Sequence, residues 1–258
     1  MVVAEAWRHR MLVSSFVRRQ YQLRYRQSFA GFLWAIVPPL ASLSVATLVF
    51  HEVIGVETGS ISYPLFLLAG LAPWSFFQSG LSGGISSIVA QQSMVTRLAF
   101  PRAAIPLSIL GTGLIDLAIT SVLFVVFAIV TGAGIPLTAL WAPLLLLVEI
   151  VFTAGIVLFG SALNMFVRDV KLAVPLLAQL WLLLTPVMYP LDTVPDRLRP
   201  FYLANPMTGL IESFRDVLIL GLRPDLELLA PSLIGAVLIF TAGAWYFGVT
   251  EPRFADVI

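Results

Sequence analysis

The sequence predicts an all-α integral membrane protein with six transmembrane helices, and three observations support this class. Of the 258 residues, 59% are hydrophobic and only 11% are charged, whereas about 25% of the residues in a soluble domain are charged. Several apolar runs exceed the roughly 20 residues with which a helix crosses the hydrocarbon core of a bilayer. No stretch alternates apolar and polar residues with a period of two, as a membrane-spanning barrel requires.

The first two spans differ in length. The first covers Phe29–Phe50 and contains two adjacent prolines. The second starts near Ile61, within an uncharged stretch, Thr58–Thr96, that is longer than one crossing. We therefore expect the second helix to continue past Gly83 as a bent helix.

The remaining spans follow in order. The third covers Ala103–Thr131, and a glycine-rich turn at 132–136 leads to the fourth, Leu137–Val167. The fifth covers Leu172–Leu191 and the sixth covers Leu228–Thr250. Residues 1–258 thus form one transmembrane domain, with a cytoplasmic helix at 1–28, five spans within 29–191, an outer segment at 192–227, the sixth span at 228–250 and a tail at 251–258.

The distribution of Lys and Arg predicts the orientation of the chain. Eleven of the 15 lie in the N-terminal segment, in the loops near 91–102 and 168–171, and in the tail. The other four lie between residues 192 and 227, where six acidic residues accompany them. Because loops on the cytoplasmic side carry the excess of basic residues, we expect both termini in the cytoplasm.

The segment before the first span, 12–31, has an amphipathic pattern. Aromatic and apolar residues recur every three to five positions, with arginines such as Arg18 and Arg19 between them. This pattern is typical of a helix in the cytoplasmic membrane interface. It serves either as an anchor on the membrane surface or as a docking site for a partner protein.

The outer segment contains an apolar stretch, 205–222, that is interrupted by Glu212, Arg215 and Asp216. Glu212 and Arg215 are three positions apart, so they can form an ion pair on one helix face. The stretch is too short for a crossing and is followed by polar residues. One interpretation is a hairpin lying on the outer surface, but we favour a re-entrant hairpin that dips partway into the membrane.

Two acidic residues, Asp116 and Glu149, fall near the middle of predicted spans. A carboxylate at that depth costs about 2.5–3.5 kcal/mol, so each should face other helices or water. One hypothesis is a proton relay in a secondary transporter. No basic residue shares the spans and no internal repeat is visible, so we favour a structural role.

The sequence lacks the motifs of several kinds of catalytic site. It has no cysteine, no HExxH motif and no phosphate-binding GxxxxGK[ST] motif, and its one lysine is Lys171. Both histidines lie outside the spans. We therefore expect no catalytic residue, no metal site and no cofactor bound by this chain, and a role in transport.

Several stretches together resemble the permease subunit of polysaccharide ABC exporters, the type-2 ABC transporter permeases that export O-antigen, capsule, teichoic acid or galactan. The resemblance covers nearly the whole chain, in order and with matching spacing. It rests on RYRQSFAGFLWAIVPPL (Arg24–Leu40), SYPLFLLAGLAPWSFF (Ser62–Phe77), LAFPRAAIPLS (Leu98–Ser108), FVRDVKLAVPLLAQLWLLLTPVMYP (Phe166–Pro190) and NPMTGLIESFRD (Asn205–Asp216).

The resemblance implies a homodimer in a bacterial inner or plasma membrane, with the pathway at the dimer interface. Two separate ATPase subunits would hold ATP and Mg²⁺, and the substrate would be a polyprenyl-linked polysaccharide; no nucleic acid is expected as a partner. The implied coupling residues, on cytoplasmic segments that would contact the ATPase, are Arg97, Pro101, Arg102, Arg168 and Asp169. The outer segment is similar to the re-entrant helices of the family that narrow the exit of the pore, which implies a gate with Glu212, Arg215 and Asp216.

A conduit for a long glycan should bind weakly, and aromatic faces complement the apolar C–H edges of sugar rings. Trp34, Trp181 and Tyr189 are therefore candidates for the lining of the pathway. Two alternatives stay open. One is an ABC permease for a drug or a lipo-oligosaccharide, and the other is a proton-coupled carrier that uses Asp116 and Glu149.

Overall fold

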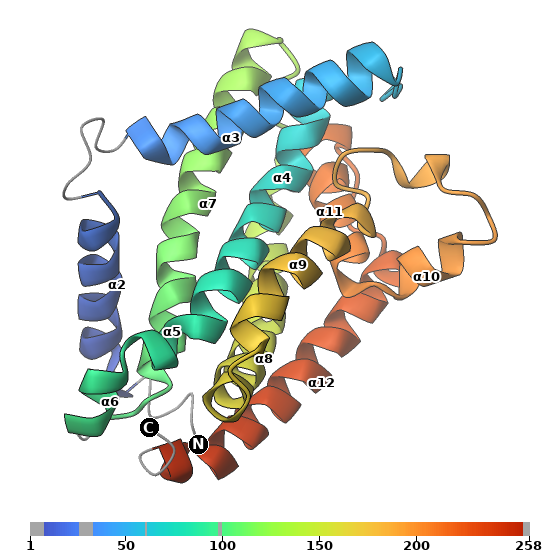
Figure 1. Cartoon of the computed structure of the whole chain (residues 1–258). Helices are drawn as coiled ribbons and strands as arrows, with labels where there is room; N and C mark the ends of the chain where they lie inside the picture. The colour runs from blue at the N-terminus through green and yellow to red at the C-terminus, as the bar shows by residue number, and fades with distance from the viewer. Residues whose placement is uncertain (1–7, 26–32, 60, 98–99, 255–258) are drawn as a thin grey trace.

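The structure is a computed structural model that describes residues 8–25, 33–59, 61–97 and 100–254. All regular structure in these residues is helical (Figure 1). In chain order the elements are α2 (Arg10–Tyr25), α3 (Leu33–Ala46), η1 (Thr47–Val53), α4 (Tyr63–Ser79), η2 (Gly80–Gly84), α5 (Ile85–Ala90), α6 (Gln92–Arg97), α7 (Ala104–Val130), η3 (Leu137–Trp141), α8 (Ala142–Phe166), α9 (Val170–Leu183), η4 (Leu191–Thr193), α10 (Arg199–Ala204), α11 (Pro206–Arg215), η5 (Asp216–Leu220), α12 (Leu226–Thr250) and η6 (Glu251–Arg253).

Within the described residues, five continuous helical segments are long and apolar enough to cross a membrane. The prediction of an all-α, multi-pass membrane protein is therefore confirmed. The predicted start of the first span, Phe29, lies outside the described residues, as do residues 1–7 and 255–258. The five segments are Leu33–Val53, Tyr63–Ala90, Ala104–Val130, Leu137–Phe166 and Leu226–Arg253.

The predicted fifth span differs from its helix in the structure. Helix α9 has 14 residues and ends at Leu183, well before the predicted Leu191. At about 1.5 Å per residue it is too short to cross a hydrocarbon core of about 30 Å alone. Pro186 and Pro190 explain the early end, because proline lacks the N–H that a helix needs and restricts the preceding residue.

The predicted bend in the second span is present. Helices α4 and α5 are joined without a break by η2, a π-helical turn at Gly80–Gly84. Glycine permits close packing here, because a Cβ added to Gly84 would lie 2.6 Å from the Val157 side chain of α8. The turn at 132–136 likewise depends on glycine, since Gly132 and Gly134 both adopt a positive φ.

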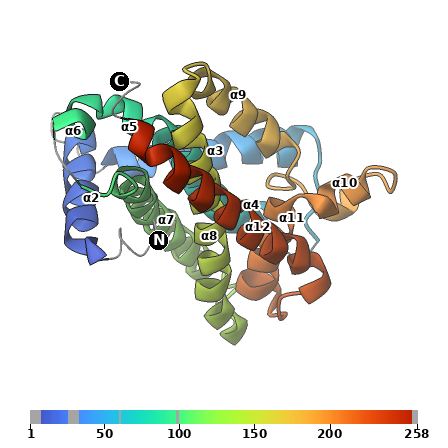
Figure 2. The same ribbon diagram turned by 90° about the horizontal axis from the view of Figure 1, so that it is seen from below.

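Helices α8 and α12 cross with their backbones in contact (Figure 2). A Cβ added to Gly243 would lie 2.1 Å from the carbonyl oxygen of Gly155. A Cβ added to Gly155 would in turn lie 2.5 Å from the backbone nitrogen of Phe240. Small residues at such a crossing let membrane helices approach closely, so that van der Waals contact holds them together.

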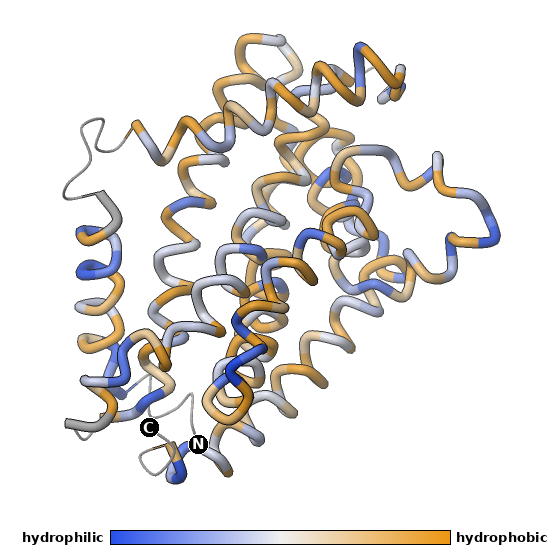
Figure 3. The backbone as a smooth tube through the Cα atoms, in the orientation of Figure 1, coloured by the Kyte–Doolittle hydropathy of each residue, from blue (hydrophilic) through white to orange (hydrophobic). Residues whose placement is uncertain are grey.

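Among the five candidate spans, the segment that contains α4 is the most buried, and α4 has neighbours in α7, α8 and α11. Its side chains Leu67, Leu68, Phe76 and Phe77 are fully buried. By contrast, the long helices around it expose large apolar side chains, such as Ile129 at 70%. Figure 3 shows hydrophobic residues along these helices and hydrophilic ones at α2, at the lower end and around α10. This distribution suits a protein surrounded by lipid.

The amphipathic helix predicted before the first span is α2. It packs against α7 through Phe16, which is buried together with Ala104 and Ile105. Val17 fits against Gly111, where an added Cβ would lie 2.5 Å from the valine. Its placement in the membrane interface stays a prediction.

Candidate functional site

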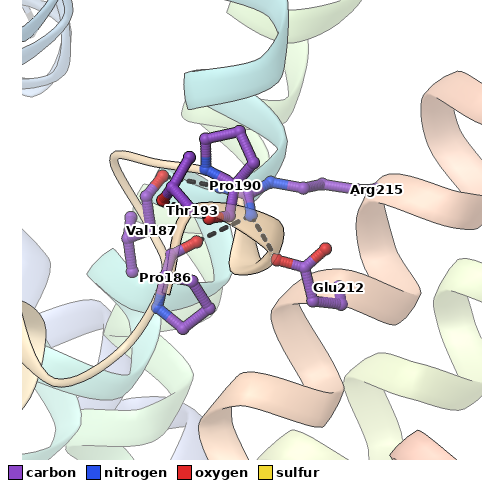
Figure 4. Close-up of polar contacts among 6 residues, drawn as sticks. All are labelled: Pro186, Val187, Pro190, Thr193, Glu212 and Arg215. Atoms are coloured by element: carbon purple, nitrogen blue, oxygen red, sulfur yellow. Dashed lines mark hydrogen bonds and ion pairs between the residues drawn. The ribbon is translucent and has the colours of Figure 1, made fainter. Parts of the chain in front are cut away.

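The end of α9 and the helix α11 meet at a buried arginine (Figure 4). The Nη1 atom of Arg215 donates to the carbonyl oxygen of Pro186 and to Oε1 of Glu212, each at 2.6 Å, and Nη2 donates to the carbonyl oxygen of Val187 at 2.6 Å. The guanidinium group also lies 3.6 Å from the centre of the Phe66 ring. Arg215 is only 2% exposed.

These contacts provide hydrogen-bond donors for carbonyl groups that lie just beyond the end of α9. Carbonyl groups that leave a helix lose their intrahelical partners, and inside a membrane protein other groups of the protein must replace them. Thr193 supports the same segment, because its Oγ1 donates to the carbonyl oxygen of Pro190 at 2.7 Å (Figure 4).

The three residues predicted as a gate lie together. The ion pair of Glu212 and Arg215, expected from their spacing, is present. Burial raises the pKa of the Glu212 carboxyl, and the Arg215 guanidinium opposes this shift. Burial also raises the pKa of Asp216, and nearby Asp225 adds to the rise. All four side chains line a cavity of about 710 Å³, and the gating role stays a prediction.

Asn205, which the sequence analysis did not single out, makes a second junction between α9 and α11. Its Oδ1 accepts from Trp181 Nε1 at 3.0 Å and from the backbone nitrogen of Met207 at 3.1 Å. Its Nδ2 donates to Thr185 Oγ1 at 2.9 Å and to the carbonyl oxygen of Leu184 at 3.2 Å. The Asn-Pro pair at a helix start was the available signal, since asparagine caps helices and proline favours the first helical position.

The candidate pathway residues fall in two places. Trp34 lies in the first turn of α3 and is 54% exposed. Trp181 lies edge-on to Phe77 and Phe152, with ring centres 5.0 and 6.3 Å away. The indole ring of Trp181 therefore packs against aromatic side chains of α4 and α8.

Tyr189 lies just beyond the end of α9, close to the Trp181 junction. Its hydroxyl donates to the carbonyl oxygen of Leu183 at 2.7 Å and lies 2.9 Å from the hydroxyl of Tyr202. The structure thus brings Trp181 and Tyr189 to one region but leaves Trp34 on another helix. Their role in lining a pathway stays a prediction.

Three of the segments implied in coupling lie at the same end of the bundle (Figure 1). They are α6, the loop between α8 and α9, and the segment that leads into α7. Arg168 and Asp169 are exposed in the loop, and Pro101 precedes α7. Arg97 ends α6, and its side chain lies outside the described residues.

Arg102 makes contacts within the chain. Its backbone N–H donates to Oε1 of Glu251 at 2.9 Å, and its Nη1 donates to the backbone carbonyl oxygen of the same residue. The guanidinium also lies 5.9 Å from the centre of the Phe254 ring. Arg102 therefore joins the start of α7 to the end of α12.

The two intramembrane acids have different surroundings. Glu149 is fully buried in α8, and neither carboxyl oxygen has a hydrogen-bond partner among the described residues. Its helix positions relative to Leu145 and Phe152 place it on the face that packs into the largest hydrophobic cluster. Asp116 is half-buried in α7.

Comparison with known proteins decides the family. The model of the ABC-2 type transporter family matches residues 11–219. The chain belongs to the ABC-2 type transporter family. The predicted resemblance to this class of permease is thereby confirmed.

The relatives of this ABC-2 type transporter chain are polysaccharide permeases. It is 32% identical to the O-antigen export system permease protein RfbA of Myxococcus xanthus, over 100% of this chain and 99% of the relative. A protein of the same description from Klebsiella pneumoniae is 28% identical, over 96% and 95% of the two chains. The polysialic acid transport protein KpsM of Escherichia coli is 25% identical, over 82% and 83%.

In this ABC-2 type transporter chain, hydrogen bonds join the charged loop between α8 and α9 to α5. Asn164, buried near the end of α8, donates to the carbonyl oxygen of Ile85 at 3.2 Å and accepts from the backbone nitrogen of Lys171 at 3.1 Å. It therefore fixes the loop that carries Arg168 and Asp169 against α5. The part of the chain that the structure describes contains no nucleotide-binding domain.

Proposed function

We propose that this chain is the membrane-spanning subunit of an ATP-driven exporter that moves a lipid-linked, O-antigen-like polysaccharide outward across a bacterial inner or plasma membrane. The observation that carries the proposal is the match to an O-antigen export permease over the full length of both chains. A homodimer of this chain with two ATPase subunits is the assembly that fits a single chain without a nucleotide site. ATP and Mg²⁺ belong to the partner.

The proposal gives each irregular element a role. Helix α9 with residues 184–190 forms the fifth of six crossing segments, α11 and η5 form the re-entrant gate, and both termini lie in the cytoplasm. Helix α2 is the interface helix. The cavity beside Glu212 and Arg215 presents carboxylate and guanidinium groups, both of which can hydrogen-bond sugar hydroxyls.

Deleting the gene for this chain tests the proposal directly. We expect surface polysaccharide to disappear and the lipid-linked polymer to accumulate inside the cell, because the polymer is still synthesised but has no route outward. Immunoblotting of surface and total glycan measures both pools. Unchanged surface glycan, with sensitivity to a drug instead, would favour the alternative of a drug or lipo-oligosaccharide permease.

The energy source of transport gives a second prediction. Replacing the phosphate-binding lysine of the co-purifying ATPase should stop export completely, whatever the proton gradient, because this chain has no means of using ATP itself. Export assayed in inside-out vesicles, with ATP and with an imposed proton gradient as separate arms, measures this. Export driven by the gradient alone would contradict the proposal.

The buried acids provide the test against the proton-coupled carrier. We expect the double variant Asp116→Asn, Glu149→Gln to retain export, since both amides keep the size of the side chain and the acids have a structural role. Vesicle export of the folded double variant is the measurement. Loss of export with normal folding would favour the carrier.

A further inference from the structure

A cavity of about 450 Å³ lies between α2, the η2–α5 segment, α6 and α7. Its volume is within the range of about 300–1,000 Å³ that is typical of ligand sites. Helix α2 forms one wall and is held in place by Val17, which packs against Gly111. The cavity is therefore part of the packed structure and separate from the junction of α9 and α11.

The polar lining of this cavity favours an anion. Arg19 and Gln20 come from α2, and Gln91 comes from the link between α5 and α6. Arg19 is the one charged residue in the lining, and no Asp or Glu contributes to it. In the described part of the chain, the ion pairs involve other arginines. A guanidinium and two carboxamides together present N–H donors that match phosphoryl oxygens.

The lining contains three serines, and two of them, Ser86 and Ser87, do not add donors. Ser87 Oγ donates to the carbonyl oxygen of Gly84, and Ser86 Oγ donates to those of Ser82 and Gly83. Each hydroxyl has one hydrogen, which the helix backbone already accepts. Recognition of an anion therefore depends on Arg19, the two glutamines and the remaining serine of the lining, Ser93.

Most of the remaining lining residues are apolar. Phe16 and Leu23 on α2, Met94 on α6 and Ile109 on α7 face the same space. A free inorganic anion makes no use of such a surface, whereas an amphiphile places a charged head on Arg19 and a hydrocarbon chain along these side chains. Electrostatic attraction between basic residues and anionic lipid headgroups is common at the cytoplasmic membrane surface.

We infer that this cavity binds the phosphoryl head of a membrane lipid, with Arg19 pairing the phosphate and the start of the hydrocarbon chain on Phe16 and Leu23. Two lipids carry this chemistry, a polyprenyl diphosphate and an anionic phospholipid. Identifying the lipid as the polyprenyl carrier of the substrate rests on the proposed function. The inference that the cavity binds a phosphate group does not rest on it.

The test measures binding of two short lipids to the detergent-purified protein by native mass spectrometry. The probes are farnesyl diphosphate and dioctanoyl phosphatidylglycerol, and farnesol and dioctanoylglycerol are the controls that lack phosphate. Arg19→Gln should weaken binding of at least one phosphate probe by about tenfold or more, because a hydrogen bond to a charged group is lost. The phosphate-free controls should bind weakly to both proteins.

Arg18→Gln is the matched control, because Arg18 is the neighbouring arginine on α2, is exposed as Arg19 is, and does not line the cavity. Equal losses in the two variants, or equal binding of farnesol and farnesyl diphosphate, would overturn the inference. Preference for the diphosphate identifies the carrier as the ligand, and preference for the glycerol lipid identifies a phospholipid. The experiment measures lipid binding and does not depend on glycan export. Failure of the lipid-site inference can therefore be distinguished from failure of the proposed function.

Discussion

Arg215→Met is expected to lower the thermal unfolding midpoint of the purified protein by about 6–20 °C. Removing one partner of a buried ion pair costs about 3–5 kcal/mol, and each kcal/mol corresponds to about 2–4 °C in a chain of this size. The variant leaves Glu212 unpaired and the carbonyl groups of Pro186 and Val187 without their donor. Methionine fills similar space, so the effect reports lost polar contacts rather than a cavity.

Arg199→Met is the control, since Arg199 pairs with Asp192 at 3.1 Å on the surface. An exposed pair contributes about 0–1 kcal/mol, so this variant should lower the midpoint by no more than about 4 °C. Adding Glu212→Gln to Arg215→Met should restore part of the loss, because the unpaired buried charge is gone. Equal shifts in the two arginine variants would show that Arg215 does not hold α9 to α11.

Gly243→Val is expected to abolish stable packing of α8 against α12. The new side chain would start 2.1 Å from the carbonyl oxygen of Gly155, and a backbone atom cannot rotate away as a side chain can. Overpacking typically costs about 1–3 kcal/mol and more where the backbone must move. The measurement is the fraction of monodisperse protein after gel filtration, together with the thermal midpoint.

Ala242→Val, one residue earlier on the exposed side of α12, is the matched control. It adds a similar bulk toward lipid and should leave both readouts close to those of the parent protein. If Gly243→Val behaved like this control, the backbone contact would not be needed for stability.

The long helices were predictable because their signal is local. The limits of the third and fourth spans agree with α7 and with η3–α8 to within one residue at each end. The apolar run through α9 continues to Leu191, however, so hydropathy placed the end of that helix too late. Pro186 marked the break, but hydropathy does not show what satisfies the freed carbonyl groups.

The junction of α9 with α11 depends on contacts that sequence spacing does not reveal. The pair of Glu212 and Arg215 is three positions apart and was predictable. The contacts of Arg215 with Pro186 and Val187 span 29 and 28 residues, and no periodic pattern connects such positions. Asn205 illustrates the same limit, because its capping role was visible in the sequence but its bonds to Leu184 and Thr185 were not.

The long reach of these contacts has a consequence for how the protein is made. The ribosome synthesises the segment that follows α9 before it synthesises the residues that hydrogen-bond to the carbonyl groups of this segment. The carbonyl group of Leu184 is bound by Asn205, 21 residues later, and those of Pro186 and Val187 are bound by Arg215, 29 and 28 residues later. During that interval the open backbone cannot rest in hydrocarbon. We therefore expect the end of α9 and helix α11 to leave the insertion machinery for the bilayer as one unit.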